Sequence, residues 1–445
     1  MSTSPYEQTL SRLEDGSATI GIIGLGYVGL PLALACARAG YRVIGFDINA
    51  DRVGAINAGS QVISYLDPAE MREAIAAGKF EATTDFARLG EPDALSICVP
   101  TPLTRNRDPD LSYVVNTADM IAKTLRPGQL VVLESTTWPG TTREVVQPVL
   151  ERAGGIAGET FFLAFSPERE DPGNKSFNTV SIPKLVGADD PRSRKLAETF
   201  YGKTVAKVVP VNSAAVAEAA KLTENIFRAV NIALVNELKL VYAEMGIDVW
   251  EVIAAAATKP FGYQAFYPGP GLGGHCIPID PFYLTWKARE FGIESRFIEL
   301  AGQINTSMPR HVVGELARAL NAQAGRGLKG SKVLILGLAY KSDVDDLRES
   351  PSLTLIDMIE AQGATCDFHD PHIPVVPSTR EHASLSGRAS TPLDGKTLAG
   401  YDAVLIATDH STVDYPLVAR HARLIVDTRN ALAKRGVEAP QAVKA

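Results

Sequence analysis

A glycine-rich turn that joins an apolar run to a helical pattern constrains the fold of this chain most. The run TIGII leads directly into residues 24–29 (GLGYVG), and a helical pattern follows. This order predicts a strand, a tight turn and a helix, the opening unit of a parallel α/β sheet. We expect Gly24 to form the turn, Gly26 to let a pyrophosphate approach the backbone, and Gly29 to let the helix pack on the strand.

An acidic residue after the next apolar run indicates which cofactor such a turn binds. The segment YRVIGFD ends at Asp47, eighteen residues after Gly29. A carboxylate there can bind both hydroxyls of an adenosine ribose and repels a 2′-phosphate, so we predict NAD rather than NADP. Arg52 is near enough to contact adenine or a phosphate, which keeps this preference open. A glycine turn can also be purely structural, but the strand, the helix and the acid agree on a nucleotide site.

Apolar runs alternate with helical patterns in two parts of the chain. They predict an α/β fold with two Rossmann-like doubly wound domains joined by a long central helix. The predicted boundaries are 17–210 for an NAD-binding domain, 211–310 for a central helical segment that dimerises and carries active-site residues, and 325–445 for the second domain. From Ala214, apolar residues recur every three or four positions for about thirty residues, which predicts the long helix. The surface of this helix is suited to an interface between copies of the chain, so we expect a homodimer or higher homo-oligomer. Light scattering measures the oligomeric state.

Composition and charge exclude several functions. Of 445 residues, 45% are hydrophobic and 21% charged, and the net charge of −7 argues against nucleic-acid binding as the main activity. The chain starts without a basic and apolar leader, and its apolar runs are short. We therefore expect no membrane insertion and a cytoplasmic location. The four cysteines are far apart and form no CxxC pair, which predicts reduced thiols and no metal site.

The most unusual segment is 267–281 (YPGPGLGGHCIPIDP). Its four glycines and four prolines predict an irregular loop whose backbone approaches a ligand closely. Cys276 has little side-chain packing there, which favours an accessible thiol. The other cysteines lie in apolar segments and are interpreted as buried small hydrophobes: Cys36, Cys98 and Cys366. His275 is adjacent, but neighbours in an extended loop point apart, so a contact with substrate, cofactor or backbone is favoured over activation of the thiol.

Five motifs in one order make the chain resemble the UDP-glucose/GDP-mannose dehydrogenase family from about Thr19 to Ala431. They are GLGYVGLP, SPERE, AAVAEAAKLTENIFRAVNIALVNE, GLGGHCIPIDP and LGLAYKSDVDDLRESP. Members of this family oxidise the C6 alcohol of a nucleotide-linked sugar twice with NAD and keep the aldehyde bound. The resemblance therefore implies NAD as the cofactor and a UDP-sugar as the substrate, bound by the domain 325–445.

This chemistry explains why a dehydrogenase needs a cysteine. The first hydride transfer yields an aldehyde, which must become an alcohol-like adduct before it can lose a second hydride. A thiolate forms that adduct as a thiohemiacetal, whose oxidation gives a thioester that water hydrolyses. The resemblance assigns this nucleophile to Cys276.

The resemblance also assigns roles to residues around the nucleophile. Lys221 stabilises charge on the reacting oxygen, and Asn225, one helical turn away, hydrogen-bonds substrate or water. Asp280 is the partner in proton transfer through Lys221 or a water. Glu168 is the base for hydrolysis, and Thr137 positions a catalytic water. Without the cysteine loop, the two helix residues would be interpreted as an ordinary solvated face.

Further positions match the cofactor and substrate contacts of the family. The NAD contacts are Gly24, Gly26, Tyr27, Val28, Gly29, Asp47, Arg52, Thr101, Thr137 and Arg348. The UDP-sugar contacts are Glu168, Arg169, Lys221, Asn225, Tyr267, Gly271, Gly273, Tyr340, Lys341 and Arg429. Close to the last NAD contact, Ser350 before Pro351 also predicts a capped helix start.

Two departures from the UDP-glucose members indicate the sugar. Many of those members carry a second glutamate four residues after the position of Glu168, where this chain has Pro172. The acid–base work then rests more heavily on Glu168. Arg169 with its PGN turn, and GHCIPIDP in place of a GSCFPKD-type loop, resemble the UDP-N-acetylglucosamine 6-dehydrogenase branch. UDP-N-acetylgalactosamine, UDP-N-acetylmannosamine and UDP-glucose are the alternatives.

Two other classes of function stay open at this point. A two-electron hydroxyacid or 6-phosphogluconate-type dehydrogenase shares the glycine turn and the long helix, and it forms one NADH per product rather than two. A non-catalytic nucleotide-binding protein is the second alternative. The combination of Lys221, Asn225, Cys276 and Asp280 argues against it.

Overall fold

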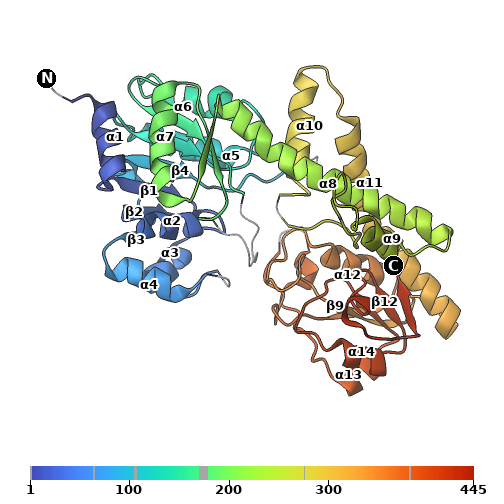
Figure 1. Cartoon of the computed structure of the whole chain (residues 1–445). Helices are drawn as coiled ribbons and strands as arrows, with labels where there is room; N and C mark the ends of the chain where they lie inside the picture. Colours follow the sequence, from blue (N-terminus) through green and yellow to red (C-terminus); the bar gives the residue numbers. More distant parts are fainter. Residues whose placement is uncertain (1–2, 64–65, 105–107, 170–178, 275, 380–381) are drawn as a thin grey trace. The chain divides into compact units, whose positions relative to one another are not determined.

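The chain folds into two units in this computed structural model, which describes residues 3–63, 66–104, 108–169, 179–274, 276–379 and 382–445. One unit comprises Met1–Glu224 and Phe282–Glu294, and the other comprises Asn225–Pro281 and Ser295–Ala445. The helix α8 (Ala214–Glu244) passes from the first unit into the second, and α10 (Asp280–Glu290) leads back (Figure 1). His275 and Pro172, considered above, lie outside the described residues.

The first unit is built on an eight-stranded sheet with the order β3-β2-β1-β4-β5-β6-β7-β8. All neighbouring strands are parallel except β6 and β7, which pair antiparallel. From β3 to β6 this is the strand order of a dinucleotide-binding sheet. The strands are β1 (Thr19–Ile23), β2 (Arg42–Phe46), β3 (Phe80–Thr83), β4 (Ala94–Ile97), β5 (Leu130–Leu133), β6 (Phe162–Phe165), β7 (Lys184–Gly187) and β8 (Val208–Val211).

Helices connect these strands and begin where polar side chains cap them. Asn49, Asp67 and Asp190 each accept a hydrogen bond from a first-turn amide. The helix after the glycine turn, α2, is apolar on all sides and buried from Gly29 to Ala37. The helices are α1 (Pro5–Asp15), α2 (Gly29–Arg38), α3 (Ala50–Asn57), α4 (Pro68–Ala76), α5 (Ser112–Ala122), α6 (Gln147–Glu151) and α7 (Pro191–Thr204), with shorter turns η1 (Phe86–Gly90) and η2 (Thr142–Val146).

The second unit contains a smaller, wholly parallel sheet with the order β10-β9-β11-β12-β13. Its strands are β9 (Lys332–Leu336), β10 (Thr365–His369), β11 (Ala403–Ile406), β12 (Ile425–Asp427) and β13 (Ala442–Lys444). Its helices include the second part of α8, α9 (Val249–Ala256), α11 (Arg296–Ala324), α12 (Pro351–Ala361), α13 (Gly395–Ala399) and α14 (Tyr415–His421), with turns η3 (Ala383–Leu385) and η4 (Ala433–Arg435). The core packs α11 and α12 against the sheet, with Leu316 and Leu320 among buried strand residues.

The predicted fold class is confirmed, and so are the long helix and the capped start of α12, where Ser350 accepts a hydrogen bond from the Ser352 amide. Four strands were not predicted: β3 (FEAT), β7 (KLVG), β8 (VVPV) and β13 (AVK). Each has three or four residues and contains a charged residue or a proline, so no apolar run marks it. All four extend a sheet outward from its centre.

Among the residues that the structure describes, no helix has both the length and the apolar composition needed to cross a membrane.

Candidate active site

The three glycines of the first turn differ in the atoms that a side chain at each position would contact. Gly24 has a φ of +92°, and a Cβ there would lie 2.7 Å from the carbonyl oxygen of Cys98. A Cβ on Gly29 would lie 1.9 Å from the carbonyl oxygen of Gly24, so only glycine lets α2 start this close to β1. A Cβ on Gly26 would meet no atom within 4 Å. The open space at the middle glycine fits a ligand that approaches the backbone.

The start of α2 also suits a phosphate. Val28 stands at the N-cap and makes no side-chain hydrogen bond to the first turn. The positive end of the helix dipole is therefore not neutralised by a capping side chain. Together with the space at Gly26, this end of α2 can receive the pyrophosphate of a dinucleotide.

Asp47 is held in place for a ribose. It is 6% exposed and follows β2 directly. Its Oδ2 accepts a hydrogen bond from the Leu25 amide at 2.9 Å, and Oδ1 accepts one from the Asn49 amide at 2.9 Å. Arg52 lies 3.4 Å from Oδ2. Because the guanidinium of Arg52 already has this carboxylate as its partner, the site fits the ribose hydroxyls of NAD better than a 2′-phosphate.

Two threonines expected near the cofactor are buried at strand ends. The carbonyl oxygen of Thr101 accepts a hydrogen bond from the hydroxyl of Tyr283 at 2.9 Å. The hydroxyl of Thr137 is buried and has no hydrogen-bond partner among the described residues. A buried hydroxyl without a partner is costly unless a water or ligand completes it, which fits a position beside NAD and water.

Glu168 contacts a buried charge cluster, formed by Lys184 and Glu134, that the sequence did not predict. Lys184 of β7 is 2.5 Å from a carboxylate oxygen of Glu134 and 3.3 Å from one of Glu168. Tyr201 and Ser96 donate to Glu134 at 2.5 and 2.6 Å. Burial lowers the pKa of Lys184, but the two carboxylates outweigh it and hold the pKa above its ordinary value. The lysine therefore stays charged and fixes one face of the Glu168 carboxylate.

The structure brings three expected residues of the first unit together. Lys221 of α8 donates a hydrogen bond to the carbonyl oxygen of Glu168. Arg169 pairs with Glu224 at 2.7 Å and donates to the carbonyl oxygen of Pro183 at 2.7 Å. The segment after β6 is thus tied to the first half of α8, which holds Glu168 and Lys221 in place.

Asn225, Asp280 and Cys276 meet in the second unit. The side-chain amide of Asn225 donates to Asp280 at 2.5 Å, and Asp280 is fully buried. The amide of Asp280 donates to the carbonyl oxygen of Cys276 at 2.8 Å, and Cys276 is partly exposed. The cysteine loop is therefore anchored to α8 through the acid that begins α10.

The other thiols differ from Cys276 in their surroundings. Burial raises the pKa of Cys36 to about 12 and also raises that of Cys366, so both stay protonated and act as small hydrophobes. Cys98 lies just past the end of β4 and the residue is partly exposed, but burial also raises the pKa of its thiol well above its ordinary value, so it too stays protonated.

The glycine–proline loop packs on residues expected to bind the UDP-sugar. A Cβ on Gly273 would lie 2.5 Å from Cβ of Tyr340, and one on Gly274 would lie 2.9 Å from its ring. A Cβ on Gly269 would lie 2.6 Å from Nη1 of Arg429. The loop glycines therefore let the backbone approach both side chains. Lys341 follows Tyr340 directly.

Arg348 lies in the same part of the second unit. Its guanidinium makes three contacts with the Asp346 carboxylate, of 3.0, 3.0 and 2.6 Å, and its carbonyl oxygen accepts a hydrogen bond from the Gly274 amide at 2.9 Å. The residue thus supports the cysteine loop through its backbone, and its predicted contact with NAD stays a prediction.

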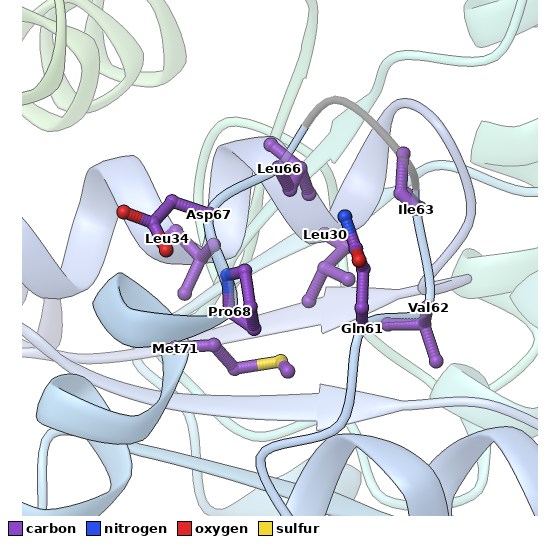
Figure 2. Close-up of a pocket in the computed structure, with 9 residues that line it drawn as sticks. All are labelled: Leu30, Leu34, Gln61, Val62, Ile63, Leu66, Asp67, Pro68 and Met71. Atoms are coloured by element: carbon purple, nitrogen blue, oxygen red, sulfur yellow. The ribbon is translucent and has the colours of Figure 1, made fainter.

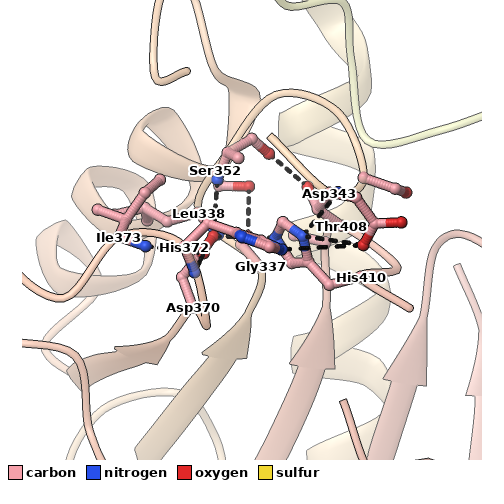
Figure 3. Close-up of polar contacts among 12 residues, drawn as sticks. Gly337, Leu338, Asp343, Ser352, Asp370, His372, Ile373, Thr408 and His410 are labelled. Carbon is pink, nitrogen blue, oxygen red and sulfur yellow. Dashed lines mark hydrogen bonds and ion pairs between the residues drawn. The ribbon is translucent and has the colours of Figure 1, made fainter. Parts of the chain in front are cut away.

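The second glycine turn differs from the first. Gly337 has a φ of +84°, and Asp370 follows β10 as Asp47 follows β2. Oδ2 of Asp370, however, accepts hydrogen bonds from the Leu338 and Ala339 amides at 2.7 and 3.0 Å and lies 3.0 Å from Nε2 of His410 (Figure 3). Groups of the protein itself therefore occupy the hydrogen-bonding positions of this carboxylate, and it is not available to a ribose.

A histidine pair beside this turn forms a polar cluster. Ligand atoms of Asp343, His372 and His410 lie within 4.8 Å of one another. Both ring nitrogens of His410 are already in use, because Nδ1 accepts a hydrogen bond from the Asp343 amide at 3.0 Å and Nε2 faces Asp370 (Figure 3). These hydrogen bonds give the cluster a structural role in closing the turn.

A small pocket in the first unit holds none of the expected site residues. It lies between α2 and the segment leading into α4 (Figure 2). Its lining residues are Leu30, Leu34, Gln61, Val62, Ile63, Leu66, Asp67, Pro68 and Met71. Seven of the nine are Leu, Val, Ile, Pro or Met, so the pocket offers little acid–base chemistry.

Three consecutive segments of the chain match the models of one protein family. Residues 18–205 match the NAD binding domain of the UDP-glucose/GDP-mannose dehydrogenase family, residues 215–307 its central domain, and residues 334–434 its UDP binding domain. This chain belongs to the UDP-glucose/GDP-mannose dehydrogenase family. It is an NAD-dependent nucleotide-sugar dehydrogenase, as predicted, and the hydroxyacid and non-catalytic alternatives are set aside.

Several similar members of the family are named for N-acetylated sugars. The chain is 34% identical to UDP-N-acetyl-D-glucosamine 6-dehydrogenase of Pseudomonas aeruginosa, over 88% of this chain and 90% of that protein. It is 36% identical to UDP-N-acetyl-D-mannosamine dehydrogenase of Pyrococcus horikoshii, over 92% and 95% of the two chains. The structure of UDP-D-ManNAc dehydrogenase from that organism matches with a TM-score of 0.85 and 33% identity, covering 96% of this chain and 98% of that one.

We predict that Gly26→Ala weakens NAD binding without loss of the fold. The added methyl meets no atom of the described residues within 4 Å, but it occupies the space through which we expect a pyrophosphate to approach. We expect the Kd for NAD, measured by calorimetry, to rise by at least about tenfold. Gly29→Ala is the matched control, because its methyl would lie 1.9 Å from the Gly24 carbonyl oxygen and should lower the unfolding midpoint. Unchanged NAD affinity in a folded Gly26→Ala protein contradicts the assignment.

We also predict that Lys184→Met destabilises the first unit and alters the pH dependence of turnover. The substitution leaves the buried Glu134 facing Glu168 without a cation, which costs about 3–5 kcal/mol of unfolding free energy. The substitution also removes the cation that lies 3.3 Å from the proposed base Glu168, so the acidic limb of the pH–rate profile moves to higher pH. Urea unfolding and pH profiles measure the two effects.

The double variant Lys184→Met with Glu134→Gln is the control for this prediction. It removes both buried charges and should recover part of the lost stability. Equal stability of the single and double variants, or an unmoved pH profile, contradicts the role given to Lys184.

Proposed function

We propose that this enzyme oxidises the C6 alcohol of UDP-N-acetylglucosamine to the carboxylate, with Cys276 as the covalent nucleophile. The observation that supports this most is the connection between the cysteine loop and α8. The Cys276 carbonyl oxygen accepts from the Asp280 amide at 2.8 Å, and Asp280 accepts from Asn225 at 2.5 Å. A partly exposed thiol, a buried carboxylate and a side-chain amide thereby belong to one connected group.

The first oxidation needs a group that takes the alcohol proton and one that stabilises the oxygen. NAD, when bound, accepts a hydride from the sugar in each of the two oxidations. We assign stabilisation of the developing charge on the C6 oxygen to Lys221, whose ammonium is held by the Glu168 carbonyl oxygen. We assign the proton to Asp280, and Asn225 donates a hydrogen bond to substrate or water.

The second oxidation uses the thiol. The Cys276 thiolate adds to the aldehyde carbon, a carbon–sulfur bond forms, and the carbonyl oxygen takes up a proton. Loss of the second hydride to NAD, together with return of the hydroxyl proton to Asp280, gives a thioester, and water cleaves it to release the acid and the thiol. Glu168 takes the proton from that water, and the buried hydroxyl of Thr137 orients it.

The remaining expected contacts divide between the two ligands. For NAD we assign the first glycine turn, Asp47 and Arg52, with Thr101 and Arg348. For the UDP-sugar we assign Tyr340, Lys341 and Arg429 and the loop residues Tyr267, Gly271 and Gly273, together with Arg169. We retain 17–210, 211–310 and 325–445 as the corresponding domains.

The choice of sugar rests on the loop GHCIPIDP and on the names of similar proteins. Relatives at 34 to 36% identity are named for N-acetyl-D-glucosamine, N-acetyl-D-mannosamine or N-acetyl-D-galactosaminuronic acid. The sugars in these three names carry an N-acetyl group, which supports an N-acetylated substrate over UDP-glucose. We place UDP-N-acetylglucosamine first and its galactose and mannose counterparts after it.

A panel of UDP-sugars tests the substrate. We expect the highest kcat/KM with UDP-N-acetylglucosamine, at least about tenfold above UDP-glucose, because a pocket that contacts the N-acetyl group loses those contacts with a hydroxyl. NADH absorbance and product mass measure the rate and the acid, and we expect two NADH per acid. A preference for UDP-glucose, or one NADH per product, overturns the proposal.

Cys276→Ser tests the covalent route. The hydroxyl is a far weaker nucleophile at neutral pH, so steady-state acid formation should fall by more than about 10³-fold while UDP-sugar and NAD still bind. Cys98→Ser is the matched control, because burial keeps the Cys98 thiol protonated and it is not among the assigned contacts, and it should retain the wild-type rate. Unchanged acid production by Cys276→Ser would falsify covalent catalysis.

We further propose a homodimer or higher homo-oligomer built on α8. Phe227, Leu234 and Val241 are about half exposed, at 48, 50 and 48%. Their spacing of seven residues places them along one stripe of the helix. A second copy of this stripe is a suitable cover, and light scattering that shows a monomer contradicts it.

A further inference from the structure

Two cations of the second unit, Lys239 of α8 and Arg429 after β12, lack a carboxylate partner. Lys239 is 7% exposed, and its Nζ makes no hydrogen bond to any described residue. Arg429 donates from Nε to the carbonyl oxygen of Ala407 at 2.9 Å and forms no ion pair in the described part of the chain. A buried ammonium that has lost its water and gained no partner is unfavourable, so this pair is suited to an anion from outside the chain.

The pair lies against the glycine–proline loop. The Gly269 amide donates to Oδ1 of Asn236 at 3.0 Å, and Asn236 is one helical turn before Lys239 on α8. A Cβ on Gly269 would be 2.6 Å from Nη1 of Arg429. The loop backbone therefore touches both the helix that carries the lysine and the arginine itself.

The acidic residues near the pair form hydrogen bonds or ion pairs with other groups. Asp427 accepts hydrogen bonds from two backbone amides of the following turn, at 2.9 and 3.1 Å. Glu315 of α11 pairs with Arg318 at 2.7 Å. Asp409 pairs with Lys434 at 3.3 Å. These carboxylates reduce the local positive potential but do not contact Nζ of Lys239.

The pKa of Lys239 lies near physiological pH. Burial and the charge of Arg429 lower its pKa to about 8, and Glu315 and Asp427 offset only part of this. An anion that contacts the ammonium favours the protonated form and raises the pKa again. Near pH 9 the free protein therefore holds this proton in a minority of molecules, whereas the complex holds it in most.

Histidine does not substitute for the lysine here. His311 of α11 also faces the cluster, but burial, Lys239 and Arg318 lower its pKa to about 4. It is neutral throughout the range in which Lys239 titrates, so it adds no charge and takes up no proton between pH 7 and 9.

We propose that Lys239 and Arg429 form a phosphate subsite for the nucleotide part of the substrate, and that Lys239 takes up a proton as the phosphate binds. The inference rests on the proposed function, which assigns a UDP-sugar to this unit. Lys239 is thereby a binding residue, and the coupling makes nucleotide affinity fall as the pH rises through the range from 8 to 10.

Calorimetric titration of the full-length protein with UDP tests the inference. At pH 9, in two buffers of different ionisation enthalpy, we expect the wild type to take up roughly 0.5 to 1 proton per UDP. Lys239→Met should take up none from this source and should bind UDP about 10- to 100-fold more weakly at pH 7, the loss expected for one charge-assisted hydrogen bond. Lys396→Met, an exposed lysine of α13, is the matched control and should behave as the wild type.

Thermal unfolding without UDP separates weak binding from misfolding. The pKa of Lys239 is lower in the folded chain than in the unfolded chain, so the unfolded state binds more protons between about pH 8 and 10.5 and stability rises with pH there. Removing the buried charge should raise the unfolding midpoint of Lys239→Met at pH 7, and the gain should shrink toward pH 10.

The outcomes distinguish this inference from the proposed function. Equal UDP affinity and equal proton uptake in wild type and Lys239→Met overturn the subsite while leaving the dehydrogenase proposal intact. Absence of UDP binding by the wild type, with Lys239→Met more stable than wild type, overturns both the subsite and the substrate assignment.

Discussion

The direction of the parallel strands is the constraint on which the first half of the candidate site depends. Gly24, Asp47, Thr101, Thr137 and Glu168 follow β1, β2, β4, β5 and β6, and these five strands are neighbours that run the same way. Parallel strands end at one edge of a sheet, so residues up to 144 positions apart in the chain (168 − 24 = 144) reach that edge together. The proposed cofactor contacts and the proposed hydrolytic base therefore share one location as a consequence of topology.

The same topology occurs twice, but its chemistry differs. In the first turn, Gly26 leaves open space and Asp47 accepts two backbone hydrogen bonds. In the second, Asp370 accepts four amide hydrogen bonds and also contacts His410. Each additional protein donor occupies a lone pair that a ribose hydroxyl would need. The second sheet thus uses the strand–glycine–helix unit as structure, and the ligand contacts that we propose for this unit come from Tyr340 and the cysteine loop.

Buried charge distinguishes the two units in another way. Around Glu168, Lys184 and Glu134 neutralise one another, so the cluster fixes a carboxylate without leaving a charge unpaired. Around Arg429, the nearby acids have other partners and Lys239 is left with a lowered pKa. The first arrangement stabilises the carboxylate that we propose as the base, whereas the second lowers the stability of the free protein and, in the proposed subsite, attracts an anion.

The sequence by itself determined the features whose cause is local. Patterns of neighbouring residues predicted the fold class, the first nucleotide turn and α8. These patterns are the apolar runs, the glycine turn with an acid after the next strand, and the helical periodicity over the thirty-one residues of α8. The cysteine loop was equally visible, because four glycines and four prolines around one thiol are unusual in composition.

Only the tertiary structure decided the partners of charged residues. Lys184 and Glu134 are fifty positions apart, and Lys239 and Arg429 are one hundred and ninety apart, so no local pattern marks either pair. Lys184 also begins a short strand that apolar periodicity does not reveal. The charge state of such a group depends on its burial and on the charges that folding brings near it, which the order of residues does not contain.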